Sequence, residues 1–201
     1  MIELPTATGL ARVRVTAGGS RGLLCLGHGA GGGTDAPDLV AVTAAGAARG
    51  WTVARVEQPY RVAGRRAPAP AVQLDAAWTA VVAELRPRAP DGPLVVGGRS
   101  SGARVACRTA SATGAAGVVC LAFPLRPPRR PQAPSRLGEL MSVAVPVLVV
   151  QGDRDPFGSL ADFPGDMALV EVVPVAGDHS LRRSAAEVAA AVADWLDQRV
   201  A

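Results

Sequence analysis

The chain has 201 residues, of which 49% are hydrophobic, and this length and composition predict one domain, residues 1–201, with a full hydrophobic core. Its net charge of +4 comes entirely from arginine, because the sequence contains no lysine. The absence of lysine excludes a Walker A phosphate loop, a Schiff-base enzyme and a pyridoxal phosphate anchor, and the scattered arginines do not predict nucleic-acid binding.

No stretch predicts a membrane span, since the apolar run over residues 117–123 is too short and Pro146 interrupts the run over 143–150. The first residues lack the basic patch of a signal peptide, so we expect a cytoplasmic protein that does not bind membranes. With two histidines and no Cys-x-x-Cys, we expect no metal. Small buried thiols are predicted at Cys25, Cys107 and Cys120.

The first half of the chain begins with two segments, residues 2–4 and 11–16, that predict an antiparallel hairpin at the edge of a sheet. Residues 23–27 form a continuous apolar run, which predicts a central strand buried on both faces. A helix is predicted from about residue 34 to Arg49, and the next strand covers residues 51–57.

In the second half, a loop rich in arginine and proline over residues 61–70 precedes a predicted helix over 71–85. A second loop of this kind covers 123–135. A short helix over 136–141 and a last helix capped by Ser184 and Glu187 complete the helical elements. Further strands are predicted over residues 94–97, 117–122, 147–151 and 169–175. This alternation predicts an α/β fold with a mostly parallel twisted sheet and helices on both faces.

A Gly-x-Ser-x-Gly pentapeptide, Gly98 to Gly102, stands between the strand over 94–97 and a helical pattern. A strand, a sharp turn and a helix are what a nucleophilic serine needs, because the turn exposes the hydroxyl and the helix directs its first amides at a developing oxyanion. The two glycines leave room where the strand and the helix cross. We therefore predict that Ser100 is a nucleophile.

A nucleophilic serine also needs a base and an acid, and later strands end in residues of these types. His179 follows the last strand and is predicted to be the base. Asp153, Asp155 and Asp178 compete for the acid. The hydrolase pattern, with the acid three residues after the glycine that ends its strand, favours Asp155, and Asp153 stays open as a turn cap or an alternative acid. The chain order Ser, Asp, His is that of the α/β-hydrolases.

The oxyanion donors are predicted to be the backbone amides of Ala30 and Ser101. Ala30 follows a His-Gly pair in the loop after the strand over 23–27, and Ser101 follows the predicted nucleophile. We expect His28 to order this loop by hydrogen bonding. The same loop also fits the dinucleotide-binding fingerprint at Gly27, Gly29 and Gly32. In that fingerprint the helix starts on the third glycine, whereas Pro37 predicts a later helix start in this sequence, so we do not favour a dinucleotide site.

Arginines in the two loops could contact an acidic substrate, although we favour solvated loop charge as their role. These are Arg65, Arg66, Arg126, Arg129, Arg130 and Arg136. Phe157 and Phe163, beside the loop of Asp155, are expected to be exposed, where they could form an interface with another chain. The sequence does not define the oligomeric state.

Six segments together resemble a known family: LLCLGHGAGG, VEQPYRVAGRR, VGGRSSGARVA, LAFPLRPP, VLVVQGDRDPFG and GDHS. They are similar to the small bacterial α/β-hydrolase-like proteins related to animal testis-expressed hydrolase-like proteins and to NSL chromatin-complex subunit 3, some of them dienelactone-hydrolase-like. The resemblance covers about residues 21–196. It implies a minimal α/β-hydrolase fold with little or no cap, and it maps the family's serine, aspartate and histidine onto Ser100, Asp155 and His179. Ser101 departs from the family pattern, where methionine is expected to be common.

We therefore expect a serine hydrolase that cleaves a small carboxylic ester, thioester or lactone through an acyl-enzyme, with no cofactor. The alternative is a non-catalytic protein-interaction module on the same fold, because the resemblance implies scaffold members in the animal branch of the family.

Overall fold

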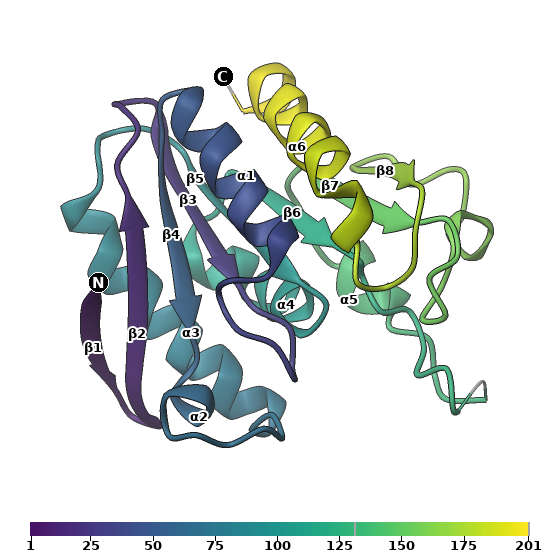
Figure 1. The fold of residues 1–201 in the computed structure, drawn as a ribbon, viewed down its shortest axis with the longest axis horizontal. Helices are drawn as coiled ribbons and strands as arrows, with labels where there is room; N and C mark the ends of the chain where they lie inside the picture. Colours follow the sequence, from purple (N-terminus) through teal and green to yellow (C-terminus); the bar gives the residue numbers. More distant parts are fainter. Residues whose placement is uncertain (131, 201) are drawn as a thin grey trace.

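The computed structural model, which describes residues 1–130 and 132–200, contains within those residues one eight-stranded sheet with helices on both faces (Figure 1). The strands lie in the order β1-β2-β4-β3-β5-β6-β7-β8. The pairs β1–β2 and β2–β4 are antiparallel, and all the other pairs are parallel. This arrangement confirms the predicted fold class, including the hairpin at the edge. The strands are β1 (Ile2–Thr6), β2 (Gly9–Thr16), β3 (Gly22–Gly27), β4 (Trp51–Glu57), β5 (Leu94–Arg99), β6 (Gly117–Leu121), β7 (Val147–Gly152) and β8 (Val170–Val175).

The helices form two layers. Helices α1 and α6 lie side by side over one face of the sheet, and α3 and α4 pack together on the other (Figure 1). The α-helices are α1 (Pro37–Ala48), α2 (Pro59–Val62), α3 (Ala71–Leu85), α4 (Ser101–Thr113), α5 (Leu137–Met141) and α6 (Ala185–Arg199). The short 3-10 helices are η1 (Arg86–Arg88), η2 (Leu160–Asp162) and η3 (Arg182–Ser184).

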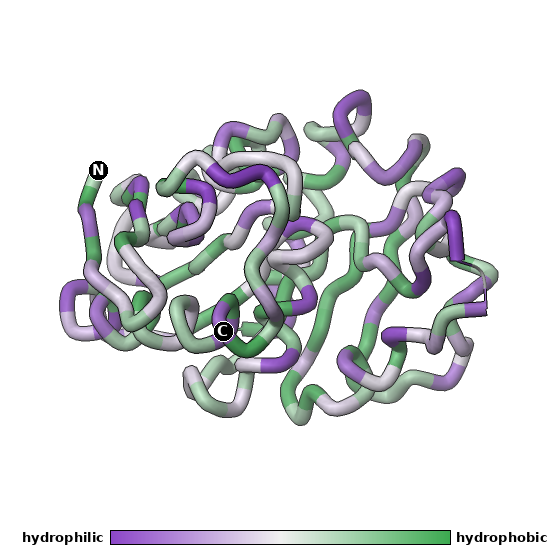
Figure 2. Tube along the Cα trace, turned by 90° about the horizontal axis from the view of Figure 1, so that it is seen from below, coloured by the Kyte–Doolittle hydropathy of each residue, from purple (hydrophilic) through white to green (hydrophobic). Residues whose placement is uncertain are grey.

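The core is divided by the sheet into two hydrophobic clusters, because successive side chains of a strand point to opposite faces. In β3, Leu23 and Cys25 belong to the cluster under α3 and α4, whereas Leu24 and Leu26 belong to the cluster under α1 and α6. Burial raises the pKa of the Cys25 thiol to about 12. Figure 2 shows hydrophobic segments concentrated inside the trace and hydrophilic segments around its rim. The unbroken apolar runs of the central strands follow from this burial on both faces.

Two ion-paired arginines hold α4 against its neighbours. Arg104 pairs with Glu139 of α5 at 2.5 Å, and Arg108 pairs with Asp75 of α3 at 2.6 Å. All four side chains are largely buried, so these pairs are screened less by solvent than surface pairs are. The helix that begins at the candidate elbow is therefore fixed from both sides.

Some boundaries and local contacts differ from those predicted. Helix α1 begins at Pro37, because proline is well suited to the first helical position, and residues 59–62 form a helical turn where the sequence predicts the end of a strand and a loop. The predicted capping box at Ser184 is wrong. The Ser184 hydroxyl donates to the carbonyl of Ala176 instead, and no side-chain cap bond forms at α6.

The connections at the carboxyl ends of the strands are modest in size. Within residues 122–130 and 132–146, the only helix is the five-residue α5, in line with a minimal cap. None of the helices in the described part of the chain has the length and hydrophobicity that a membrane crossing needs.

Candidate active site

The candidate residues lie where the topology of the sheet changes direction. Strands β3 and β5 are parallel neighbours, but the segment after β3 leads to α1 on one face and the segment after β5 leads to α4 on the other. In open parallel sheets such a point leaves a crevice beyond the carboxyl ends of the strands, where ligands bind. The candidate residues at this edge are Ala30, Ser100, Ser101, Asp155 and His179.

Ser100 lies in the sharp turn between β5 and α4, with a backbone φ of 52° and ψ of −107°. This conformation is strained for a residue other than glycine and is typical of a nucleophile elbow. The Ser100 amide donates to the carbonyl of Leu121 at 2.9 Å, which ties the turn to β6. A Cβ on Gly102 would lie 2.5 Å from the carbonyl oxygen of Gly27, so glycine is what lets α4 start this close to β3.

Three side chains form a continuous line of hydrogen bonds. The Oδ2 atom of Asp155 lies 2.8 Å from Nδ1 of His179, and Nε2 of His179 lies 2.9 Å from Oγ of Ser100. The Asp155 side chain is fully buried, whereas His179 and Ser100 are partly exposed. With Nδ1 donating to the carboxylate, Nε2 carries no proton and can accept the proton of the Ser100 hydroxyl.

The two other aspartates considered for the acid bind elsewhere. Oδ1 of Asp153 accepts a hydrogen bond from the amide of Gly177 at 2.7 Å, which is a turn-capping contact. Oδ1 of Asp178 accepts from the amide and the hydroxyl of Ser180, at 2.9 and 2.6 Å. Among the described residues, the carboxylate hydrogen-bonded to the ring of His179 is that of Asp155.

Two residues for which the sequence predicts no such contact hold the Asp155 carboxylate. Gln151, fully buried in β7, donates through Nε2 to Oδ2 of Asp155 at 3.0 Å. The amide of Phe157 donates to Oδ1 of the same carboxylate at 2.8 Å. The Asp155 carboxylate therefore receives hydrogen bonds from three directions, which fixes its orientation toward His179.

Phe157 also contacts the candidate base directly. Its ring stacks on that of His179 with the centroids 4.1 Å apart and an angle of 30° between the planes. This aromatic contact restricts the rotation of the imidazole and covers one of its faces. Phe163 is buried, with 8% of its surface exposed, so the expectation that both phenylalanines are exposed is wrong.

The two candidate oxyanion amides come from different segments of the chain. The Ser101 amide is the first N–H group of α4, a position that has no acceptor within its own helix. Ala30 lies in the loop after β3, and its carbonyl accepts a hydrogen bond from the Tyr60 hydroxyl at 2.8 Å. Tyr60, at the start of α2, thus anchors the backbone next to the Ala30 amide.

His28 orders the same loop. Its Nδ1 lies 2.8 Å from the carbonyl oxygen of Gly29, and its Nε2 lies 3.1 Å from the amide nitrogen of Gln58. Burial lowers the pKa of His28 below its ordinary value, so the ring is neutral near pH 7. A neutral ring that donates through Nδ1 and accepts at Nε2 satisfies both contacts. His28 is not part of the line from Asp155 to Ser100.

The arginines of the two rim loops differ in their surroundings. Arg136 is partly buried and donates through Nη1 to the carbonyl of Pro124 at 3.0 Å, so its contact is structural. The exposed members of the set are Arg65, Arg66, Arg126, Arg129 and Arg130. Contact between these side chains and an acidic substrate stays a prediction.

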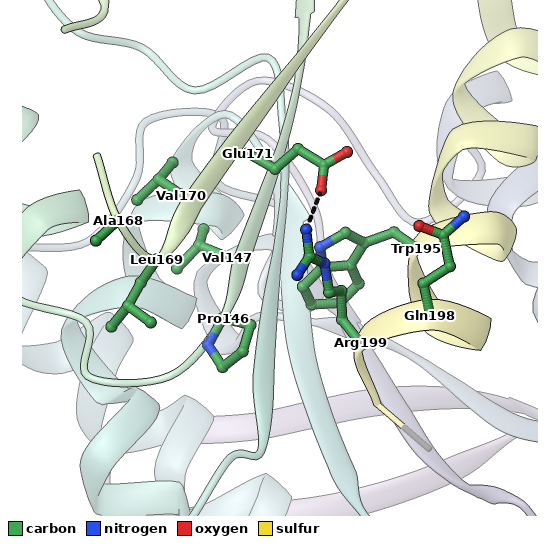
Figure 3. A pocket seen from close by; sticks show the side chains of 9 residues that line it. All are labelled: Pro146, Val147, Ala168, Leu169, Val170, Glu171, Trp195, Gln198 and Arg199. Carbon is green, nitrogen blue, oxygen red and sulfur yellow. Dashed lines mark ion pairs between the residues drawn. The ribbon is translucent and has the colours of Figure 1, made fainter. Parts of the chain in front are cut away.

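Two hollows lie at opposite ends of the strands. One, of about 250 Å³, lies beside the acid loop, and its lining includes Leu125, Arg126, Pro156 and Phe157. The other, of about 370 Å³, lies where β7 and β8 begin, and there Arg199 pairs with Glu171 at 3.6 Å (Figure 3). The second hollow contains no candidate residue and lies far from the carboxyl ends of the strands, so we assign it no role in the chemistry.

A strained serine elbow and a hydrogen-bonded Asp–His–Ser line on this sheet are the features of an α/β-hydrolase. A comparison with known families matches residues 20–198 to the alpha/beta hydrolase domain, and the chain belongs to that family. Comparison with curated proteins gave no significant match. The narrower resemblance to the animal testis-expressed proteins stays a prediction.

Solved structures support the fold. The chain is similar to an alpha-beta serine hydrolase homologue from Coxiella burnetii, with a TM-score of 0.79, 18% identity, and 97% of this chain and 96% of that chain covered. It is also similar to XC6422 from Xanthomonas campestris, a serine hydrolase without lid, with a TM-score of 0.78, 19% identity and coverage of 99% and 94%. Est1E from Butyrivibrio proteoclasticus matches with a TM-score of 0.82, 14% identity and coverage of 98% of both chains.

Proposed function

We propose that this chain is a serine hydrolase that cleaves a small carboxylic ester, thioester or lactone, and that its residues 1–201 act as one domain. The observation that carries the proposal is the line of hydrogen bonds from Asp155 through His179 to Ser100, with Ser100 in a strained turn. A merely structural serine has no need of a conformation that costs about 1–3 kcal/mol.

The first half of the reaction forms an acyl-enzyme. Oγ of Ser100 attacks the carbonyl carbon of the substrate while its proton passes to Nε2 of His179, 2.9 Å away. Asp155 stabilises the resulting imidazolium through Nδ1. The carbonyl oxygen becomes an oxyanion, which the amides of Ala30 and Ser101 receive, each worth about 3 kcal/mol of the barrier. When the tetrahedral intermediate collapses, the carbon–oxygen or carbon–sulfur bond breaks and His179 protonates the departing alcohol or thiol.

The second half of the reaction restores the enzyme. A water molecule gives its proton to Nε2 of His179 and adds to the acyl carbon, and collapse of this second intermediate releases the carboxylic acid and returns the proton to Ser100. The short connections over the site favour substrates that reach Ser100 without the opening of a large cap. No step needs a cofactor.

A fluorophosphonate probe tests the proposal, because it labels an activated serine without knowledge of the substrate. We expect the folded protein to be labelled at Ser100 and to hydrolyse short p-nitrophenyl esters. Ser100→Ala should abolish both. Ser101→Ala is the matched control, since it alters the neighbouring side chain but keeps the backbone amide, and it should retain most of the activity.

The alternative is a non-catalytic interaction module on the hydrolase fold. The absence of label from folded wild-type protein would favour the module. Full esterase activity in Ser100→Ala would overturn the proposed mechanism.

A further inference from the structure

Arg99 lies directly before the proposed nucleophile, at the end of β5, and only 16% of its side chain is exposed. Its Nη2 donates a hydrogen bond to the backbone carbonyl oxygen of His179 at 2.6 Å. Its Nε lies 3.0 Å from Oδ2 of Asp38, a carboxylate with no exposed surface in the first turn of α1. One guanidinium therefore joins the elbow, the loop of His179 and helix α1.

The same guanidinium also packs against the loop that carries the proposed oxyanion donor. A Cβ built on Gly29 would lie 3.1 Å from Nη1 of Arg99, so the Arg99 side chain occupies the space beside the backbone of Gly29. Ala30 is the next residue. The segments that hold the proposed nucleophile, base and oxyanion amide thus meet at this one cation.

A cation in this place needs a buried counter-charge, because removing a guanidinium from water is costly unless it is paired. Asp38 supplies that charge. Burial raises the pKa of the Asp38 carboxyl above its ordinary value, and the nearby Arg99 guanidinium opposes the rise. The Arg99 guanidinium therefore favours the charged form of the Asp38 carboxyl, against the effect of burial.

Neutral backbone amides and the Asp153 carboxylate hold the start of the His179 loop. The amide and the carbonyl of Gly177 are bound by the Asp153 carboxylate and the Arg154 amide, at 2.7 and 2.9 Å. At His179 itself, the carbonyl is held by the charged donor of Arg99. A hydrogen bond from a cation is about twice as strong as one between neutral groups.

We propose that Arg99 is a positioning residue. Its guanidinium, neutralised by Asp38, fixes the position of the His179 backbone relative to the elbow and to the loop that carries Ala30. This role rests on the proposed function, because the place of His179 matters for turnover only if His179 is the base. Misplacement of a catalytic group by about 1 Å can cost roughly 10²-fold in rate.

The kinetic test compares Arg99→Met, which keeps the length of the side chain but removes the charge and the donors, with wild type. We expect kcat for p-nitrophenyl acetate to fall about 10²-fold with little change in KM. Guanidinium ion added to Arg99→Ala should restore part of kcat, which a purely structural defect would not allow. Arg154→Met is the matched control, because that side chain is 75% exposed near the same loop, and its kcat should not change. Unchanged kcat in Arg99→Met, or no rescue of Arg99→Ala by guanidinium ion, would overturn the role.

A second measurement needs no turnover and separates this role from the proposed function. The imidazole proton between Nδ1 of His179 and Asp155 should resonate far downfield in the proton NMR spectrum, and His179→Asn identifies it. In Arg99→Met this resonance should broaden or shift while the amide spectrum keeps its dispersion. An unchanged resonance would overturn the positioning role. A changed resonance in a protein whose wild type takes no fluorophosphonate label would uphold the positioning role and overturn the proposed function.

If Arg99→Met does not fold, Arg99→Lys provides the same comparison. Lysine keeps a charge near Asp38 but lacks the planar fork that reaches two partners at once. We expect it to keep the fold and to show both the lower kcat and the altered resonance. A wild-type kcat together with an unchanged His179 resonance in Arg99→Lys would overturn the positioning role.

Discussion

Gly102→Ala tests how closely the elbow is packed against the end of β3 and the loop that follows it. A Cβ at Gly102 would lie 2.5 Å from the carbonyl oxygen and 2.6 Å from the carbonyl carbon of Gly27, and 2.9 Å from the carbonyl oxygen of His28. These are backbone atoms, so no side-chain rotation can relieve the overlap. The backbone of α4 must therefore move away from the end of β3.

The magnitude follows from two opposing effects. Alanine is better than glycine inside a helix by up to about 1 kcal/mol. Overpacking of this kind costs typically about 1–3 kcal/mol. Together they leave a net cost of about 0–3 kcal/mol, which at roughly 2–4 °C per kcal/mol for a chain of this size lowers the melting temperature by up to about 12 °C. Since the shift also separates the Ser101 amide from Ala30, we expect kcat to fall by about 10²-fold.

Thermal unfolding followed by circular dichroism, together with esterase kinetics, measures both effects. Gly138→Ala is the matched control, because it also replaces a helical glycine, in α5, and its Cβ would meet no atom within 4 Å. The control should melt at or above the wild-type temperature with unchanged kcat. A Gly102→Ala variant that melts as high as wild type and hydrolyses esters as fast would refute the reasoning.

The sequence predicts most of the framework because its signals are local. Apolar runs mark the central strands, since those strands are buried on both faces and have no polar side to interrupt the run. The order of Ser100, Asp155 and His179 along the chain is equally visible, because each follows a strand of the same parallel sheet. Parallel strands bring their carboxyl ends to one edge, so residues far apart in sequence can be expected to meet there.

The contacts that the sequence does not reveal depend on which side chains the fold brings together. Nothing in a linear pattern pairs Arg99 with Asp38, because a single arginine in a turn is indistinguishable from a solvated one until α1 is placed against β5. Phe157 is a similar case. Its aromatic ring in a loop suggests an exposed surface, whereas the turn after Asp155 directs it onto His179.

A predicted capping motif does not form where its side chain has a hydrogen-bond partner elsewhere in the fold. Ser184 and Glu187 have the spacing of a capping box, but the Ser184 hydroxyl binds the carbonyl of Ala176 in the loop before η3. A capping box does form at Ser159 and Asp162, where the carboxylate accepts from the Ser159 amide at 2.8 Å. The sequence spacing is the same in both, so the difference arises from the loop that precedes each helix.

Two further changes probe the acid and the loop histidine. Asp155→Asn should lower kcat by about 10⁴-fold, because the amide favours the wrong tautomer of His179, whereas Asp153→Asn keeps an acceptor for Gly177 and should stay near wild type in the same ester assay. Equal losses in both variants would reject Asp155 as the acid. Burial lowers the pKa of His28 below its ordinary 6.5, so the unfolded chain takes up a proton there that the folded chain does not as the pH falls below about 6.5. The free energy of unfolding in urea should therefore decrease from about pH 7 to about pH 5, and His28→Asn should lessen that decrease. An equal decrease in the variant would show that this histidine is not held neutral by the fold.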